Sequence, residues 1–326
     1  MPDALVATFV AGTGATLSPS VLQSITEQLE KSGAANVRST WLVEGQAADV
    51  FFEQPENQRT SFPRKRESSA RDSEHETLRR ADALHWIPAF AGMTLSGVDC
   101  IIQPVATRRK KLLLADMEST IIEQEMLDEL ADTIGIRDKV AAITARAMNG
   151  ELDFKAALHE RVGLLRGLPV CVLYEVAQRI TLMPGAAELL ATMKANGAVA
   201  WLVSGGFTCF AKPVADRLGF DRVFANELII RDEMITGEVA EPIVDKNAKK
   251  DLLQKACAEL GLSLAQTMTV GDGANDIPML STCNDGGGLG VAYHAKPNVR
   301  SVIPHQINHG DLRALLNAQG YAIPRS

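Results

Sequence analysis

Cysteine is scarce in this sequence and shows no sign of pairing. The chain of 326 residues has five cysteines, an odd number, and they are scattered: Cys100, Cys171, Cys209, Cys257 and Cys283. No two of them have the Cys-x-x-Cys spacing of a zinc or redox site. The pattern therefore excludes a disulfide framework and a structural zinc site, and it favours a reducing compartment.

Long hydrophobic runs are also lacking. No apolar run reaches the ~18–20 residues that a transmembrane helix needs. The stretch 4–10 is apolar, but it follows Asp3 and has no basic segment before it, which argues against a signal peptide. We therefore expect a cytoplasmic protein in which residues 4–10 form a buried strand.

Basic residues do not outnumber acidic residues. Lys and Arg total 33 against 40 Asp and Glu, which gives a net charge of −7. This balance makes the chain a poor candidate for nucleic-acid binding, which needs a basic face to displace counterions from phosphates. It does not exclude a small anionic substrate, because a local site can be positive on an acidic protein.

Length and hydrophobic content predict a globular protein of two domains. Hydrophobic residues make up 46% of the 326 residues, and one domain usually takes about 150 residues. Strand-like or helix-like patterns appear at 5–10, 18–32, 41–44, 48–52 and 98–103. We expect these segments to form a small N-terminal accessory α/β domain over residues 1–107.

Residues 55–95 interrupt this accessory domain with a different composition. Charges of both signs are dense there, apolar residues are few, and no core-forming period runs through the stretch. We predict a disordered, solvated insert. Ser61-Phe-Pro-Arg-Lys-Arg-Glu-Ser68 and Trp86-Ile-Pro-Ala-Phe-Ala-Gly-Met-Thr94 resemble peptides translated from dispersed palindromic repeats of bacterial genomes, which suggests an insert without activity.

From residue 108 onward, strand-like and helix-like segments alternate. Short apolar strands are expected at 112–115, 198–203, 222–225 and 267–270. This alternation predicts an α/β fold with a doubly wound, mostly parallel sheet, buried on both faces. Residues 122–185 have a helical pattern and predict a cap over an active site, which leaves 108–121 and 186–326 as the core of this second domain.

Two candidate motifs follow predicted strands, at the edge where open α/β sheets bind ligands. Asp116 and Glu118 stand two residues apart after a buried strand, where paired carboxylates supply a nucleophile and an acid/base. The alternative is an acidic helix cap. Ser204-Gly-Gly-Phe207 combines a hydroxyl with glycines that let backbone N–H groups approach an anion, although such a turn is common.

Two further motifs carry charges of opposite sign. Lys246-Asn-Ala-Lys-Lys250 begins a predicted helix; a solvated face is the usual reason for such lysines, but a lysine near the carboxylates would neutralise phosphate charge. Gly271-Asp-Gly-Ala-Asn-Asp276 places two acidic residues in a Gly-rich turn, which suits an oxygen-preferring cation such as Mg²⁺. Burying Asp272 at a strand end has little structural benefit, so this last motif is the most specific.

In this order the four motifs resemble those of the haloacid dehalogenase superfamily of aspartate-nucleophile phosphatases. Residues 110–311 are similar to its phosphoserine phosphatase family, in the stretches 116–125, 161–169, 203–207 and 293–297. The N-terminal segment is similar in position to the accessory domain of bacterial members. The resemblance implies Mg²⁺-dependent hydrolysis of L-phosphoserine to L-serine and phosphate through an aspartyl-phosphate, the last step of serine biosynthesis.

The resemblance also implies roles for individual residues. Asp116 is the expected nucleophile, and Glu118 is the expected acid/base. The expected Mg²⁺ ligands are Asp116, the backbone carbonyl of Glu118 and Asp272. Asp276 is expected to orient the metal shell and the lysine that binds phosphate. The groups expected to bind the phosphoryl oxygens are Ser204, Gly205, Lys249 and Asn275.

The cap is expected to select the substrate. Phosphoserine carries an ammonium group, which is expected to pair with Glu125, and a carboxylate, which suits the bidentate guanidinium of Arg161. Met148 and Phe154 are expected to form an apolar lid that excludes water. Without the resemblance, a helical Glu and Arg are usually solvated, and Met and Phe usually belong to the core.

The chain departs from the family pattern at two places. Glu118 replaces the usual Asp, and its extra methylene shifts the reach of the carboxylate by ~1.5 Å, a misplacement that can cost ~10²-fold in rate. We expect activity to survive, with Glu118 as the acid/base. The stretch 281–288 is longer than the usual link, and we expect it to bulge on the surface.

Three functions stay open on the sequence alone. The first is hydrolysis of phosphoserine. The second is action on another small phosphate ester, as a phosphatase or as a phosphotransferase to an alcohol such as homoserine. The third is a decayed copy that only binds or regulates, motivated by Glu118 and the insert. The expected partner is a small-molecule substrate, without nucleic acid or membrane, and a homodimer is left open.

Overall fold

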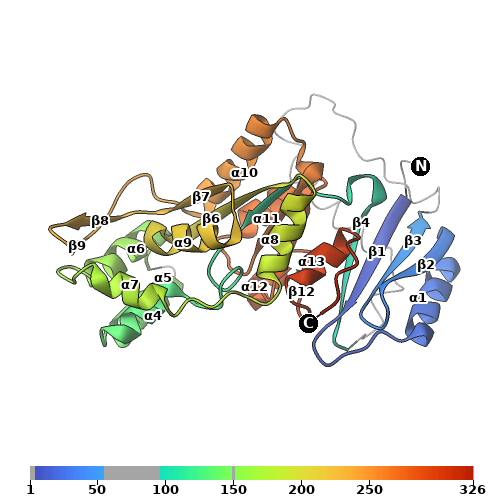
Figure 1. The fold of residues 1–326 in the computed structure, drawn as a ribbon, viewed down its shortest axis with the longest axis horizontal. Coiled ribbons are helices and arrows are strands. Elements are labelled where there is room, and N and C mark those ends of the chain that lie inside the picture. The colour runs from blue at the N-terminus through green and yellow to red at the C-terminus, as the bar shows by residue number, and fades with distance from the viewer. Residues whose placement is uncertain (1–3, 55–95, 149–150, 326) are drawn as a thin grey trace.

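The computed structural model describes residues 4–54, 96–148 and 151–325. The molecule is elongated, with a four-stranded sheet at one end, a six-stranded sheet in the middle and a group of helices at the other end (Figure 1). The expected insert 55–95 lies outside the described residues, so its disorder stays a prediction.

The N-terminal sheet has the strand order β2-β3-β1-β4, with antiparallel neighbours. Its strands are β1 (Ala4–Ala11), β2 (Ala35–Val43), β3 (Ala47–Glu53) and β4 (Val98–Pro104). Helix α1 (Pro19–Lys31) begins after Ser18, whose hydroxyl caps the first turn, and its buried Ile25 and Leu29 join the core of this sheet. Strand β2 begins earlier than the strand expected at 41–44, because its first half is mostly exposed and carries no apolar signal.

Strands β3 and β4 lie on either side of β1. Both run antiparallel to β1, so they run in the same direction as each other. Glu53 at the end of β3 pairs with Ala4, whereas Val98 at the start of β4 pairs with Ala11. The end of β3 and the start of β4 therefore lie at opposite ends of β1.

The central sheet consists of parallel strands in the order β12-β11-β10-β5-β6-β7. They are β5 (Leu112–Ala115), β6 (Val199–Phe207), β7 (Arg222–Asn226), β10 (Thr267–Gly271), β11 (Leu289–Tyr293) and β12 (His305–Ile307). Strand β5 is the first of these along the chain, and it lies between β10 and β6, where the strand order reverses. Such a reversal is the usual ligand site of an open α/β sheet.

Helices cover both faces of the central sheet, which confirms the doubly wound fold. Alternate residues of β5 enter different apolar cores: Leu113 and Ala115 pack into one, and Leu112 and Leu114 pack into the other. The surrounding helical elements are η2 (Val105–Thr107), α8 (Ala186–Ala195), α9 (Thr208–Leu218), α10 (Lys246–Leu260), η3 (Leu264–Gln266), α11 (Ile277–Asp285), α12 (Pro297–Arg300) and α13 (Arg313–Ala318). Among the described residues, no helix is long and apolar enough to cross a membrane.

The first four helices between β5 and β6 lie at the far end of the molecule (Figure 1). They are α4 (Met126–Thr133), α5 (Arg137–Met148), α6 (Phe154–Gly163) and α7 (Cys171–Ala177). A hairpin of β8 (Leu228–Arg231) and β9 (Met234–Val239) joins them, through a hydrogen bond from the amide of Gly167 to the carbonyl of Ile235. This hairpin was not predicted, because its turn residues Asp232 and Glu233 take positive φ angles without a glycine.

The expected surface bulge at 281–288 is wrong. Residues 281–285 complete helix α11, and the side chain of Cys283 is fully buried. The glycines that follow are closely packed: a Cβ atom at Gly286 would lie 2.2 Å from the Cβ of Leu264, and one at Gly288 would lie 2.4 Å from the carbonyl oxygen of Leu264. The extra length is therefore taken up by the end of α11 and by glycines that pack closely against η3, while Asp285 stays exposed.

Helix α13 fills the junction between the two sheets. Every residue of α13 is buried. Arg108 donates from Nε to the carbonyl of Ala318 at 2.8 Å, and its Nη2 lies 2.5 Å from Oδ1 of Asp49 in β3. Gln103 of β4 donates to the same carbonyl at 2.8 Å. Buried polar contacts thus attach the N-terminal sheet to the rest of the chain; the domain boundary after residue 107 stays a prediction.

Candidate active site

The predicted motifs meet at the carboxyl edge of the central sheet. Asp116 directly follows β5, Ser204 lies near the end of β6, and Asp272 directly follows β10. Because β10 and β6 are the parallel neighbours of β5, these three side chains lie at the same edge. Lys249 reaches this edge from the first turns of α10.

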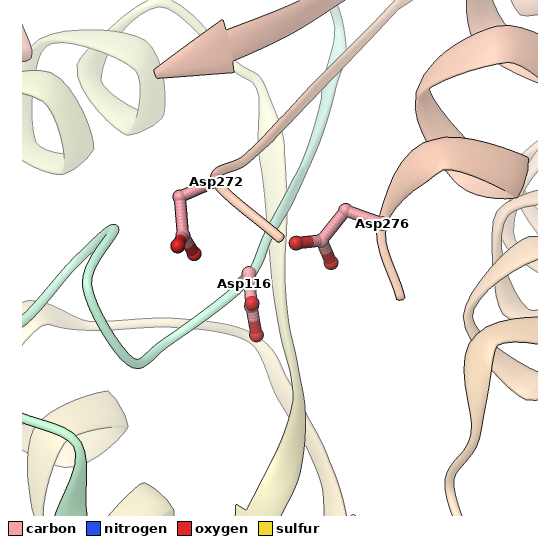
Figure 2. A group of neighbouring side chains, drawn as sticks. All are labelled: Asp116, Asp272 and Asp276. Carbon is pink, nitrogen blue, oxygen red and sulfur yellow. The ribbon is translucent and has the colours of Figure 1, made fainter. Parts of the chain in front are cut away.

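Three buried carboxylates form the centre of the site. Asp116, Asp272 and Asp276 are 5%, 6% and 0% exposed, and an oxygen from each lies within 4.8 Å of the others. Figure 2 shows the three side chains gathered around a common space. Asp276 was expected only to support the metal shell, but the structure places its carboxylate in the same group of potential ligands as the other two.

A cation lies inside this acidic group. The Nζ atom of Lys249 is 2.7 Å from Oδ1 of Asp116 and 2.6 Å from Oδ1 of Asp276, and the lysine is 1% exposed. Burial by itself lowers the pKa of Lys249, but the two carboxylates together outweigh it and raise that pKa above its ordinary value. Lys249 is therefore a permanent positive charge in the site.

The carboxylates outnumber this positive charge, and their pKa values reflect it. Burial, followed by the neighbouring Asp276, raises the pKa of Asp272 to about 6. The pKa of Asp116 is raised as well, by burial first and then by Asp276. Buried carboxylates of this kind require further positive charge to stay ionised. Three clustered carboxylate oxygens suit a hard divalent cation, so the residues present fit the expected metal.

Glycines let the loop after β10 wrap closely around Asp276. A Cβ atom at Gly271 would lie 2.5 Å from the carboxylate carbon of Asp276, so a larger residue would displace that side chain. The amide of Gly273 donates to Oδ2 of Asp276 at 3.0 Å. A Cβ atom at Gly273 would also lie 2.4 Å from Oδ1 of Asn275, which shows that the Asn275 side chain is folded over this glycine.

Ser204, Gly205 and Gly206 belong to the irregular end of β6 rather than to a separate turn, since the pairing with β7 shifts register here. The Ser204 hydroxyl is fully buried and accepts a hydrogen bond of 2.9 Å from the amide of Gly206. A Cβ atom at Gly205 would lie 3.5 Å from the ring of Phe154. The structure therefore brings the expected lid residue against the expected phosphate site.

Glu118 connects the site to the cap. Its Oε1 accepts a hydrogen bond of 2.9 Å from the amide of Met126, the first residue of α4. Gly206 leaves the necessary room, because a Cβ atom there would lie 2.9 Å from both carboxylate oxygens of Glu118. Burial, and next the nearby Glu125, raises the pKa of Glu118 to about 7. A carboxyl group with such a pKa can donate and accept a proton at neutral pH.

Glu125 and Arg161 lie on the cap side of the site. Burial lowers the pKa of Arg161. The carboxylate of Asp128, followed by those of Glu118 and Glu125, favours its charged form. Glu125 is exposed, and its Oε1 accepts a hydrogen bond of 2.8 Å from the hydroxyl of Ser119. The side chain of Met148, at the end of α5, lies outside the described residues.

Thr120 and Lys296 contact the site although no role was predicted for them. The hydroxyl of Thr120, fully buried, lies 3.4 Å from Oδ1 of Asp272. The Nζ atom of Lys296 lies 3.7 Å from Oδ2 of Asp272, and its amide donates to the backbone carbonyl of Asp272 at 3.2 Å. Both residues stand inside stretches that carried the family resemblance, but nothing in the order of residues indicates that they reach Asp272.

Comparison with known proteins agrees with this geometry. The family model of haloacid dehalogenase-like hydrolases matches residues 113–281. The phosphoserine phosphatase of Lactococcus lactis is 43% identical over 207 residues, which are 64% of this chain and 94% of that protein. A structure described as a phospho-aspartyl intermediate analogue of phosphoserine phosphatase is 39% identical, covering 64% of this chain and 98% of its own, with a TM-score of 0.59.

One solved structure matches nearly the whole chain, including the N-terminal sheet. It is a haloacid dehalogenase family hydrolase from Salmonella enterica serovar Typhi, 30% identical, covering 96% of this chain and 97% of its own with a TM-score of 0.72. The expected family and the expected phosphatase class are confirmed by these matches. With its carboxylates, lysine and Ser-Gly-Gly segment at the edge of a doubly wound sheet, the chain belongs to the haloacid dehalogenase-like hydrolase family.

Proposed function

We propose that the protein hydrolyses L-phosphoserine to L-serine and inorganic phosphate, the last step of serine biosynthesis. The observation that carries this proposal is the contact of Lys249 with both Asp116 and Asp276, next to Asp272. This single buried group combines a nucleophile, a cation for phosphate and ligands for a metal. The substrate is supported by the relatives that are named phosphoserine phosphatase.

Asp116 is the proposed nucleophile and Glu118 the proposed acid/base. An oxygen of Asp116 attacks phosphorus, the bond from phosphorus to the serine oxygen breaks, and Glu118 gives its proton to that oxygen. Water then attacks the aspartyl-phosphate and gives a proton back to Glu118, which releases phosphate and restores Asp116. The pKa of about 7 at Glu118 suits this exchange of roles.

Mg²⁺ is the proposed metal, held by Asp116, Asp272 and the backbone carbonyl of Glu118. Asp276 lies in the same carboxylate group. When bound, the metal would offset the repulsion between the Asp116 carboxylate and the phosphate and stabilise charge in the transition state. Asp276 holds Lys249 in place. The proposed contacts to the phosphoryl oxygens come from Ser204, the amide of Gly205, Lys249 and Asn275.

The cap residues are proposed to recognise the amino-acid part of the substrate. Arg161 binds the carboxylate of phosphoserine and Glu125 its ammonium group. Phe154 and Met148 exclude water; the position of the Phe154 ring against Gly205 supports this for Phe154. The exposed position of Glu125 supports access from solvent to this end of the site.

The test is phosphate release from L-phosphoserine, with and without Mg²⁺. The wild type is expected to release phosphate only with Mg²⁺, and Asp116→Asn is expected to release none above background. Asp251→Asn, a change at an exposed aspartate of α10, is the matched control and should retain full activity. Absence of Mg²⁺-dependent release from the wild type would refute the proposed function.

A further inference from the structure

Asp99 of β4 fixes a loop of the central domain to the N-terminal sheet. Its side chain is 4% exposed. One carboxylate oxygen accepts from the amide of Asn308 at 2.8 Å, and the other accepts from the amides of His309 at 3.0 Å and Gly310 at 2.7 Å. Hydrogen bonds to a buried carboxylate are among the strong ones, so Asp99 defines the position of residues 308–310.

The same loop is bound from its other side by His294. The Nε2 atom of His294 lies 2.8 Å from the carbonyl oxygen of Gly310. Because a carbonyl only accepts, this nitrogen carries the proton. The amide of His294 donates to the carbonyl of Ile307 at 2.8 Å, and its φ of 42° is in the left-handed region. Both the backbone and the imidazole of His294 are therefore held by residues 307–310.

Two residues after His294, the chain contacts Asp272. The amide of Lys296 donates to the backbone carbonyl of Asp272 at 3.2 Å, and the Lys296 ammonium is 3.7 Å from the carboxylate. Residues 294–310 thus contact both the N-terminal sheet, through Asp99, and Asp272, through Lys296. Asp99, the 308–310 loop, His294 and Lys296 form one continuous set of contacts that ends at the carboxylate cluster.

We propose that Asp99 and His294 are positioning residues for the metal site, through which the N-terminal sheet holds residues 294–296 against Asp272. This rests on the proposed function insofar as Asp272 binds the metal. The accessory domain then contributes to the affinity for the metal without touching the metal or the substrate. Outer contacts that orient ligands commonly change metal affinity by about 10- to 100-fold when they are lost.

The test measures Mg²⁺ binding by titration calorimetry in the absence of substrate, and the KM for L-phosphoserine at saturating Mg²⁺. Asp99→Ala and His294→Phe are each expected to weaken Mg²⁺ binding by about 10-fold, with less than a twofold change in KM. His294→Gln restores an N–H donor of similar reach and is expected to recover binding close to the wild type. His294 is exposed, so its variants should fold.

Two comparisons separate positioning from simple attachment of the domain. Gln103→Met removes another hydrogen bond across the junction, to Ala318, and should lower the melting temperature while leaving Mg²⁺ affinity unchanged. The double variant Asp99→Ala/His294→Phe should lose no more affinity than the stronger single variant, because both changes act through the same loop.

Unchanged Mg²⁺ affinity in folded His294→Phe would overturn this inference, as would an equal loss in Gln103→Met or fully additive losses in the double variant. Failure of the proposed function gives a different result: the wild type would bind Mg²⁺ but release no phosphate from L-phosphoserine, and the binding comparison would still decide the role of His294. A wild type that binds no Mg²⁺ overturns both.

Discussion

The ammonium of Lys249 and the carboxylate of Asp116 are in direct contact at 2.7 Å, with both side chains buried. The ion pair favours the ionised form of the proposed nucleophile, against the burial and the neighbouring Asp276 that raise its pKa overall. It also places a positive charge where an incoming phosphate must approach the nucleophile. Activation of the nucleophile and attraction of the substrate therefore depend on the same lysine.

Replacing Lys249 should damage both activity and stability. Lys249→Met leaves Asp116 and Asp276 buried without their cation, and breaking a buried ion pair in this way costs about 3–5 kcal/mol. We expect phosphate release to fall by about 10²- to 10³-fold, as for other groups that stabilise transition-state charge. The measurements are kcat at saturating Mg²⁺ and the free energy of unfolding. Lys246→Met, at an exposed lysine of the same helix, is the control; equal effects of both changes would contradict the assignment.

Gly206 should be required for full activity, because the longer Glu118 stands opposite it in place of the usual Asp. The Cβ atom of Gly206→Ala would lie 2.9 Å from the Glu118 carboxylate and push this flexible side chain aside. A misplaced acid/base costs ~10²-fold in kcat, while the melting temperature should change little. Glu118→Asp, one methylene shorter, should recover activity in the Gly206→Ala background, and Glu118→Ala should lose several orders of magnitude in either. No recovery in the double variant would show that the two residues do not compete for space.

Much of this site was predictable because parallel strands bring their carboxyl ends to one edge. The apolar run 112–115 identified β5, and the residues that follow such strands, Asp116 and Asp272, had to be neighbours. Contacts between distant segments had no such signal. Lys296 contacts Asp272 two residues after His294, which has a left-handed φ, and a turn at a non-glycine residue is not visible in a hydrophobic pattern.

The packing of residues 281–288 was also not predictable from the sequence, because it depends on contacts with a distant segment. Insertions usually lie in surface loops, so a bulge was the natural expectation. Only the structure reveals that Gly286 and Gly288 leave space for Leu264, which lets the longer segment continue α11 and pack against η3. The place of Asp276 among the potential metal ligands was likewise underestimated, since the tight loop around it depends on the close approach of Gly271.

Stability should depend on pH and metal together. The pKa of Glu118, normally 4.5, is about 7 in the fold, and that of Asp272, normally 3.8, is about 6. A carboxyl group whose pKa is raised by folding contributes stability below its unfolded pKa and loses it as pH rises through the folded pKa. The metal-free protein should therefore lose stability between pH 4 and pH 7. Melting temperatures with a chelator or with Mg²⁺ should differ more at pH 7.5 than at pH 5.

A matched variant connects that pH effect to the carboxylate cluster. Asp272→Asn removes one of the groups with a raised pKa, so the gain in melting temperature from Mg²⁺ at pH 7.5 should shrink. Asp251→Asn, on the surface of α10, should leave the gain as it is in the wild type. An equal gain from Mg²⁺ at pH 5 and pH 7.5 in the wild type would contradict this account.

Arg161 should distinguish phosphoserine from phosphate esters without a carboxylate. Arg161→Lys cannot form a bidentate contact, and losing a hydrogen bond to a charged group costs about 1.5–3 kcal/mol. The KM for L-phosphoserine should rise about 10- to 100-fold, whereas kcat/KM for phosphoethanolamine should change less than twofold. Arg166→Lys, at an exposed arginine in a 3.8 Å ion pair with Glu238, is the control. Parallel losses for both substrates would remove Arg161 from carboxylate recognition.

The insert 55–95 should be replaceable without loss of turnover. A chain in which a flexible Gly/Ser linker of about a dozen residues takes its place should keep kcat for L-phosphoserine within twofold of the wild type. The melting temperature should also be retained, since β3 and β4 keep their pairing with β1. A large drop in kcat in a folded variant would show that the replaced residues take part in the activity.

The directions of β3 and β4 set a lower limit on how short this connection can be. Glu53 and Val98 pair with opposite ends of β1, Ala4 and Ala11, so about 24 Å separates the two joining points along the sheet. Joining Gln54 directly to Ser96 provides four peptide steps, about 15 Å at full extension. Deleting residues 55–95 without a replacement would therefore break the pairing of β4 with β1. Asp99, which belongs to β4, would then lose its hydrogen bonds to the 308–310 loop. The directions of β3 and β4 therefore demand a long connection between them, whatever sequence provides it.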